Sequence, residues 1–137
     1  MVHNGIEYSM LPAYADSFEL LHSADEFNYD LHQLAKLWNQ GSVVRSWLLE
    51  LAEDAFEKDP GLEKLEGYVD DSGEGRWTVA EAIDLDVPAP IIHAALIERL
   101  RSRDSDSFSD KLLSAMRNEF GGHAMKHEGL TPPLTAT

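Results

Sequence analysis

Four polar residues near the start of the sequence are of types that could act together on a substrate. His3 and Glu7 are four residues apart, Asn4 follows His3, and Tyr8 follows Glu7. If a helix begins here, His3 and Glu7 share a face of its first turns. An imidazole, an amide and a carboxylic acid can hold a polyhydroxy acid and exchange protons with it. The pair could also supply two metal ligands, but no third is evident, and an ordinary solvated helix turn is the simplest interpretation of these residues alone.

A second candidate is the glycine-rich segment 73–78, which contains Arg76. Thr78 and Glu81 have the spacing of a capping box, which predicts a helix that begins at Thr78. Backbone N–H groups, the dipole of that helix and the Arg76 guanidinium could together hold a phosphate group. An acidic residue within the segment opposes anion binding, however, and a plain interhelical loop explains the segment equally well.

Further basic residues lie in the second half of the chain. Arg99, Arg101 and Arg103 form a small cluster, which is also what the negative end of a helix dipole favours in its last turn. Arg117 is expected in the last turn of the final helix, and His123 follows a pair of glycines. Each of these residues can be explained by local structure alone.

The elements that would position these residues are helices, because apolar residues recur at helical spacing and no segment alternates like a strand. Pro12 is expected to kink the first helix, which extends to about residue 21. Ser42 is predicted to open the third helix, which ends near Pro60 and turns several apolar residues inward: Val43, Val44, Trp47, Leu48, Leu51 and Ala55. The other helices are expected from about 31 until Gly41 caps the end, from 78 to 83, from 90 onwards and from about 107 to 121. We therefore predict one all-α, bundle-like domain over residues 1–128 and a flexible tail over 129–137.

Composition excludes several classes of function. The 137 residues contain 11 Lys and Arg against 25 Asp and Glu, which gives a formal charge of −14. Binding to nucleic acid or to an anionic membrane needs a basic surface, so neither is expected. There are no cysteines and no apolar run long enough to span a bilayer, so we expect a cytoplasmic protein. The acidic residues are dispersed along the chain, which favours adaptation to molar salt over a single acidic docking patch.

The candidate residues lie within motifs that occur in a familiar order. The sequence HNGIEY occupies residues 3–8, LWNQG residues 37–41, GRWT residues 75–78, VP residues 87–88 and RNEFGGH residues 117–123. In this order they resemble the C-terminal helical domain of decarboxylating 6-phosphogluconate dehydrogenase, from residue 1 to about residue 127. The short distance between the first and last motifs resembles the short form of that family, in which the helical domain is not duplicated.

The resemblance implies an activity and a setting for it. The family oxidises 6-phosphogluconate at C3 with NADP or NAD, releases CO2 and forms ribulose 5-phosphate, in the pentose phosphate pathway. It also implies a dimer or tetramer formed through the helices, and a cofactor bound mainly by an N-terminal nucleotide-binding domain. By motif match, Glu7 falls on the acid that protonates C1 of the enediol. Asn4 and His3 fall on substrate-holding positions, and Asn4 also lies near the nicotinamide.

The resemblance assigns the remaining candidates to phosphate binding. Tyr8, Arg76 and Arg99 fall on positions that hold the phosphate of the substrate. Arg117 and His123 match residues that reach into the site of a neighbouring subunit and complete its phosphate pocket. This assignment fits the chemistry, because guanidinium groups form charge-assisted bonds to a phosphate and would attract an anionic substrate to an acidic protein.

The sequence also departs from the family pattern. The catalytic lysine of the family falls just before Met1, and these residues include no Gly-x-Gly-x-x-Gly nucleotide-binding motif. We therefore predict that the fragment is inactive by itself. Arg76 replaces a lysine common in the family, and Pro12 follows the site by one turn. Two alternatives stay open at this point: a stand-alone helical binding or dimerisation module without catalysis, and a metal site formed by His3, Glu7 and a later histidine.

Overall fold

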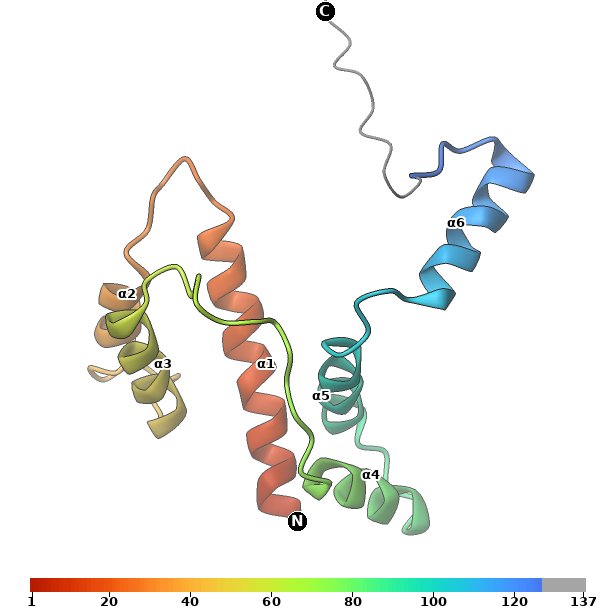
Figure 1. Cartoon of the computed structure of the whole chain (residues 1–137). Helices are drawn as coiled ribbons and strands as arrows, with labels where there is room; N and C mark the ends of the chain where they lie inside the picture. The colour runs from red at the N-terminus through yellow and green to blue at the C-terminus, as the bar shows by residue number, and fades with distance from the viewer. Residues whose placement is uncertain (127–137) are drawn as a thin grey trace, which may run out of the picture. The chain divides into compact units, whose positions relative to one another are not determined.

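The computed structural model describes residues 1–126, which form six helices and no strands (Figure 1). The prediction of an all-α fold is therefore confirmed for the described residues. The helices are α1 (Val2–His22), α2 (Leu31–Trp38), α3 (Trp47–Lys58), α4 (Glu74–Asp84), α5 (Pro90–Arg101) and α6 (Phe108–Gly121). None of these helices is long and apolar enough to cross a membrane.

The helices belong to two compact units, of which the first is Met1–Arg103 and the second begins at Asp104. The first unit contains α1 to α5 and the second contains α6. The predicted domain boundary at residue 128 and the predicted tail over 129–137 lie outside the described residues.

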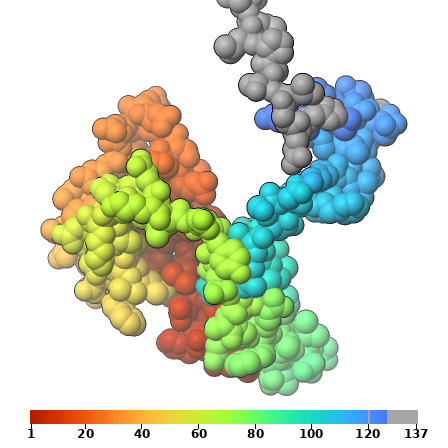
Figure 2. Space-filling model, viewed as in Figure 1, coloured from red at the N-terminus to blue at the C-terminus, as the bar shows by residue number. Residues whose placement is uncertain are grey.

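Helix α1 is the common element of the first unit, since it packs against all four of its other helices. Its C-terminal half contributes to an apolar core with α2 and α3, whereas its N-terminal half packs on α4 and α5. The connection between α3 and α4, yellow-green in Figures 1 and 2, runs across α1 before α4 begins. Helix α1 continues through Pro12, which lies inside it.

The apolar core is built around Phe18 of α1. Its ring contacts those of Trp38 and Phe56, with centroid separations of 5.5 Å and 5.0 Å. Leu49 of α3 is 0% exposed in the same core. These aromatic contacts from three helices fix the C-terminal half of α1 in place.

The third helix begins later than predicted. Ser46 caps α3 by accepting a hydrogen bond from the backbone N–H of Leu49 at 3.1 Å, while Ser42 forms a local turn with the N–H of Val44. The prediction that these residues point inward is wrong for five of them, which are exposed: Val43, Val44, Trp47, Leu51 and Ala55. At the start of the helix, the Tyr14 hydroxyl donates to the carbonyl oxygen of Val44 at 2.6 Å and lies 2.8 Å from Ser46 Oγ. This contact fixes the helix start at Ser46.

The fourth helix begins earlier than predicted. Gly73 precedes α4 with φ +91°, a conformation that favours glycine, so the helix starts at Glu74 instead of Thr78. Thr78 is buried inside the helix, where its hydroxyl contacts the carbonyl oxygens of Glu74 at 2.9 Å and Met1 at 3.0 Å. The predicted capping box at Thr78 is therefore wrong.

Within the described residues, the helix of the second unit is α6. Ser107 caps its start by accepting from the backbone N–H of Asp110 at 3.2 Å, and Gly122 ends it with φ +63°. Its predicted apolar residues are all exposed: Phe108, Leu112, Leu113 and Met116.

Candidate functional site

Tyr8 lies at the centre of a polar cluster in the first unit. It is 3% exposed, in the early turns of α1, and packs with Ala95 and Leu96 of α5. The guanidinium carbon of Arg99 lies 3.7 Å from the centroid of the Tyr8 ring, which is a close cation–π contact. Arg99 also donates from Nη1 to the backbone carbonyl of Asp70 at 3.3 Å. Two of the predicted phosphate-binding residues thus stack on each other.

The carboxylate of Asp71 joins these residues to Arg76. Its Oδ1 atom accepts from the Tyr8 hydroxyl at 3.2 Å and from the backbone N–H of Gly73 at 2.9 Å. Its Oδ2 atom accepts from Nε of Arg76 and lies 3.9 Å from Nη2 of Arg103. The Asp71 side chain is only 2% exposed. We call Tyr8, Asp71, Arg76, Arg99 and Arg103 the Tyr8–Asp71 cluster.

The hydrogen bonds in the cluster keep Asp71 ionised. The backbone N–H of Gly73, with Arg76 and the Tyr8 hydroxyl, holds the pKa of the Asp71 carboxyl below its ordinary value. Burial acts in the opposite direction, but its effect is smaller than that of these donors together. The cluster therefore contains one fixed negative charge among three guanidinium groups.

Arg103 belongs to the cluster even though it follows the end of α5. Its Nε donates to the carbonyl oxygen of Val69 at 3.2 Å, and its guanidinium carbon lies 5.9 Å from the centroid of the Tyr68 ring. Its Nη2 atom is buried and makes no hydrogen bond within the described residues. The helix dipole is therefore not the only explanation for an arginine at this position. Arg103 also links the end of α5 to the connection that precedes α4.

Two glycines allow the helices of this region to approach closely. A Cβ atom on Gly75 would lie 2.3 Å from Cε2 of Tyr8, and one on Gly5 would lie 2.8 Å from Cγ2 of Thr78. Any larger residue would push α1 and α4 apart. The Gly-x-Gly pattern is thus explained by a positive φ at Gly73 and by close packing at Gly75.

The remaining predicted residues of the first unit lie on the same early turns of α1. His3 is exposed, whereas Asn4 and Glu7 are half-buried. Asn4 is four residues before Tyr8 and therefore shares its helix face. The structure thus brings Tyr8, Arg76 and Arg99 together directly, and it places the three other polar residues within two turns of Tyr8 on one helix.

Arg117 and His123 belong to the second unit. Both line a hollow of about 440 Å³, together with Asp110, Leu113, Ser114 and Ala124. Asn118 helps to hold the turn after α6, because its Nδ2 donates to the carbonyl oxygen of His123 at 2.9 Å. Their predicted role in the site of a neighbouring subunit stays a prediction.

Asp71 and Arg103 were not identified as site residues from the sequence. Asp71 lies in a stretch of polar residues and glycines that looks like any exposed loop, and Arg103 looks like a helix-terminal cation. One signal was available for Asp71: an aspartate two residues before a glycine can accept the glycine N–H in an Asx turn. Its contacts to Tyr8 and Arg76 depend on the tertiary fold.

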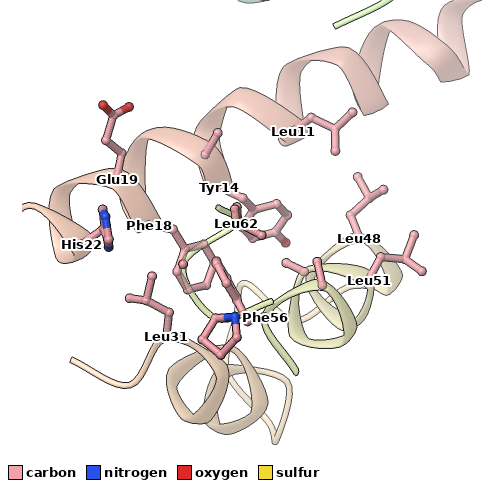
Figure 3. Close-up of a pocket in the computed structure, with 15 residues that line it drawn as sticks. Leu11, Tyr14, Phe18, Glu19, His22, Leu31, Leu48, Leu51, Phe56 and Leu62 are labelled. Atoms are coloured by element: carbon pink, nitrogen blue, oxygen red, sulfur yellow. The ribbon is translucent and has the colours of Figure 1, made fainter. Parts of the chain in front are cut away.

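Two further features of the structure bear on its chemistry. Within residues 1–126 no three His, Asp or Glu side chains lie close enough together to hold a metal ion. A pocket of about 550 Å³ lies between the C-terminal half of α1 and α3, with Phe18, Leu48 and Phe56 among its walls (Figure 3). Its lining is almost entirely apolar and includes none of the predicted site residues.

Comparison with known proteins identifies the family. Residues 1–111 match the family model of the 6-phosphogluconate dehydrogenase C-terminal domain. The chain is 48% identical over 124 residues to YqeC of Bacillus subtilis, which is provisionally named a 6-phosphogluconate dehydrogenase. It is 46% identical over 124 residues to the NAD(+)-dependent, decarboxylating 6-phosphogluconate dehydrogenase of Haloferax volcanii. Both matches cover 90% of this chain but only 41% of the relative.

A more distant relative agrees with these two. The decarboxylating 6-phosphogluconate dehydrogenase of Synechocystis is 38% identical over 109 residues, which cover 74% of this chain and 23% of that protein. The chain thus spans less than half the length of these relatives. The family match begins at residue 1 and includes all five residues of the Tyr8–Asp71 cluster. From this match, the chain belongs to the 6-phosphogluconate dehydrogenase family, and its residues 1–111 correspond to the family's C-terminal domain.

Proposed function

We propose that this chain is the substrate-binding and oligomerisation domain of an enzyme that converts 6-phosphogluconate to ribulose 5-phosphate and CO2, with reduction of NAD or NADP. The observation that supports this most directly is the meeting of Tyr8, Arg76 and Arg99 in one cluster. They come from three different helices and are 91 residues apart at the extremes, from Tyr8 to Arg99. The reaction would serve the pentose phosphate pathway in the cytoplasm.

Phosphate binding is the role we propose for this cluster. Arg76 and Arg99 would supply guanidinium N–H groups to the phosphate, and the Tyr8 ring supports Arg99 through the cation–π contact. A phosphate ester carries close to two negative charges at neutral pH, so it binds strongly to paired guanidinium groups. The cluster would also attract the anionic substrate towards a protein whose formal charge is −14.

Proton transfer is the role we propose for Glu7. Glu7 is a half-buried carboxyl group next to Tyr8 in the sequence, and by the family resemblance it would protonate C1 of the enediol once the phosphate is held. His3 and Asn4 would bind hydroxyl and carboxylate groups of the sugar acid. We propose a further contact of Asn4 with the nicotinamide, which is the role that the family resemblance implies for this position.

The dinucleotide itself does not fit the described residues. They contain no strand and therefore no βαβ unit, which is the usual dinucleotide-binding element. We propose that the bulk of the cofactor binds to a separate nucleotide-binding domain. Residues 1–137 by themselves should accordingly show no turnover of 6-phosphogluconate with NAD or NADP, and measurable turnover would contradict this assignment.

Oligomerisation completes the proposed site. Arg117 and His123 would act in the site of a neighbouring subunit and add positive charge to its phosphate pocket. The exposed apolar face of α6 supports self-association, because it presents Phe108, Leu112 and Leu113 to solvent. Light scattering of the purified chain should give a dimer or tetramer. A monomer of 15.3 kDa at micromolar concentration would contradict the proposal.

The test of phosphate binding is calorimetric titration with 6-phosphogluconate and, separately, with gluconate. The chain should bind 6-phosphogluconate more tightly, because gluconate lacks the phosphate. Arg99→Met should weaken 6-phosphogluconate binding about tenfold, since it removes charged hydrogen bonds to the phosphate. Lys58→Met removes the same charge at the end of α3 and is the matched control. Equal affinities for the two sugars would argue against a phosphate site.

We also propose that the dispersed acidic surface is an adaptation to high salt. At molar salt the Debye length falls to about 3 Å, so repulsion among surface carboxylates is largely screened. The urea midpoint of unfolding should therefore be higher in about 3 M KCl than in about 0.1 M KCl. An unchanged midpoint would remove the proposal.

A further inference from the structure

A carboxylate at the centre of a proposed phosphate site is unexpected, because it repels the ligand. Asp71 nevertheless is almost fully buried there and accepts from three donors: Gly73 N–H, Tyr8 Oη and Arg76 Nε. Arg103 adds a second positive charge beside that of Arg76, with its Nη2 atom 3.9 Å from Asp71 Oδ2. A group with this many partners is held firmly in place.

The partners of Asp71 show what it organises. Tyr8 belongs to α1, Arg76 to α4, and Arg103 lies two residues after the end of α5, so the carboxylate joins α1 and α4 to the segment that follows α5. Each of these side chains has several rotamers in the absence of a partner. Their order before ligand arrives lowers the entropy that binding would otherwise cost.

The charges of the cluster lead to the same conclusion. Arg76, Arg99 and Arg103 carry three positive charges, which repel one another when they are held together. Asp71 reduces their sum from three to two, and a phosphate ester carries close to two negative charges. The carboxylate thus stabilises the gathered arginines and leaves enough charge for the ligand.

We propose that Asp71 is a positioning residue of the phosphate site: its carboxylate holds the Arg76 guanidinium and the Tyr8 hydroxyl in place, and the phosphate binds beside it without displacing it. This inference rests on the function proposed above. The Arg76 side chain is about half exposed, so its outer N–H groups remain accessible while Nε is bonded to Asp71.

Asp71→Asn separates the two roles of the carboxylate. The amide oxygen still accepts from the Gly73 N–H, so the turn before α4 is retained. The amide nitrogen then faces Arg76 Nε, and two donors cannot bond to each other. The variant therefore releases Arg76 while keeping the backbone, and circular dichroism checks that the helices are unchanged.

Asp70→Asn is the matched control. It removes the same unit charge from the adjacent residue, whose side chain is exposed and whose contribution to the cluster is its backbone carbonyl. Loss of a nearby negative charge should leave phosphate binding at least as tight as in the wild type. Asp71→Asn should instead weaken 6-phosphogluconate binding about tenfold. Tighter binding by Asp71→Asn would mean that Asp71 competes with the phosphate, which would overturn the proposal.

A second readout does not depend on the ligand. The Arg76 Nε–H signal in proton–nitrogen NMR spectra can be assigned by its loss in Arg76→Lys. This proton should exchange slowly with water in the wild type and in Asp70→Asn. It should exchange at least about tenfold faster in Asp71→Asn, because the bond to the carboxylate is lost. Equal exchange rates in the three proteins would overturn the proposal.

A third test uses the wild-type protein alone and asks whether the phosphate displaces Asp71. When it is saturated with 6-phosphogluconate, the Arg76 Nε–H should remain as protected as before, and loss of protection would show displacement of Asp71 and overturn the proposal. If the wild type binds no 6-phosphogluconate, the proposed function fails, and the Arg76 signal of Asp71→Asn still decides whether Asp71 positions the cluster.

Discussion

The C-terminal half of α1 packs into an apolar core, whereas its N-terminal half lies against glycines and a cluster of charged groups. In the first region Phe18 is surrounded by aromatic rings from α2 and α3. In the second region the buried Tyr8 is surrounded by Arg99, Asp71 and the backbone of Gly75. One helix is thus held at its two ends by different physical forces.

The difference shows how a small domain can support a polar site. Apolar burial supplies stability with little demand on exact geometry, so it suits the end of the helix that carries no proposed chemistry. Charged groups stabilise less, but their directional bonds fix positions. The apolar end therefore anchors α1, and the charged end determines where Tyr8 and its neighbours lie.

The largest expected effect comes from the apolar end. Phe18→Ala should lower the free energy of unfolding by about 3–5 kcal/mol, because a buried ring is replaced by a cavity. Urea unfolding followed by circular dichroism measures this loss. Leu20→Ala, at an exposed position of the same helix, is the control and should change stability by less than about 1 kcal/mol. Similar losses for both variants would mean that the core does not anchor α1.

The next effect comes from the packing of the charged end. Gly75→Ala places a Cβ against the Tyr8 ring. It should lower the free energy of unfolding by about 1–3 kcal/mol, because of strain between α1 and α4. Gly67→Ala is the control, since a Cβ there meets no atom within 4 Å. Chemical unfolding of both variants checks the difference. A fully stable Gly75→Ala would show that the two helices can separate without penalty.

A smaller effect is expected at the start of α3. Tyr14→Phe removes the hydroxyl that contacts the Val44 carbonyl and Ser46, so stability should fall by about 1 kcal/mol. Tyr29→Phe is the matched control, because Tyr29 is partly exposed and its ring stacks on Phe27. Thermal unfolding of the two variants compares the losses. If Tyr29→Phe lowers stability as much as Tyr14→Phe, the hydrogen bonds of the Tyr14 hydroxyl do not stabilise the start of α3.

The smallest effect is a pH dependence of the charged end. Because the pKa of Asp71 is lower in the folded protein than its ordinary value of 3.8, the ionised carboxylate stabilises the fold above that value. This contribution is lost as the pH falls through the folded-state pKa. The stability difference between the wild type and Asp71→Asn should therefore be constant from pH 7 to about pH 5 and shrink below about pH 4. Urea unfolding across this range measures it, and a difference that grows on acidification would contradict the assignment.

The all-α fold and most helix positions were predictable from the sequence, because helical periodicity is a local signal. Phe18 and Leu31 occur at the expected apolar positions and are buried. The errors at Ser42 and Thr78 arose because several polar residues near a helix start can cap it. Tertiary contacts, from Tyr14 in one case and with a positive φ at Gly73 in the other, select among them.

The candidate site was partly predictable. The resemblance pointed to Tyr8, Arg76 and Arg99, and the structure brings these three together. Asp71 could not be found in this way, because its partners are as far as 63 residues away along the sequence. A charge in a polar loop becomes informative only when the fold shows which groups surround it.

The close approach at Gly5 and Gly75 determines which changes in chain length the domain tolerates. One extra residue in α1 between Gly5 and Tyr8 would turn the following side chains by about 100° around the helix axis, so that Tyr8 could no longer face Gly75. Insertions in the connection from α3 to α4, before Tyr68, would leave this register and the contacts of Asp71 intact, since loops absorb added length at little entropic cost. Homologous domains should therefore vary in length between α3 and Tyr68 and keep the spacing from Gly5 to Tyr8.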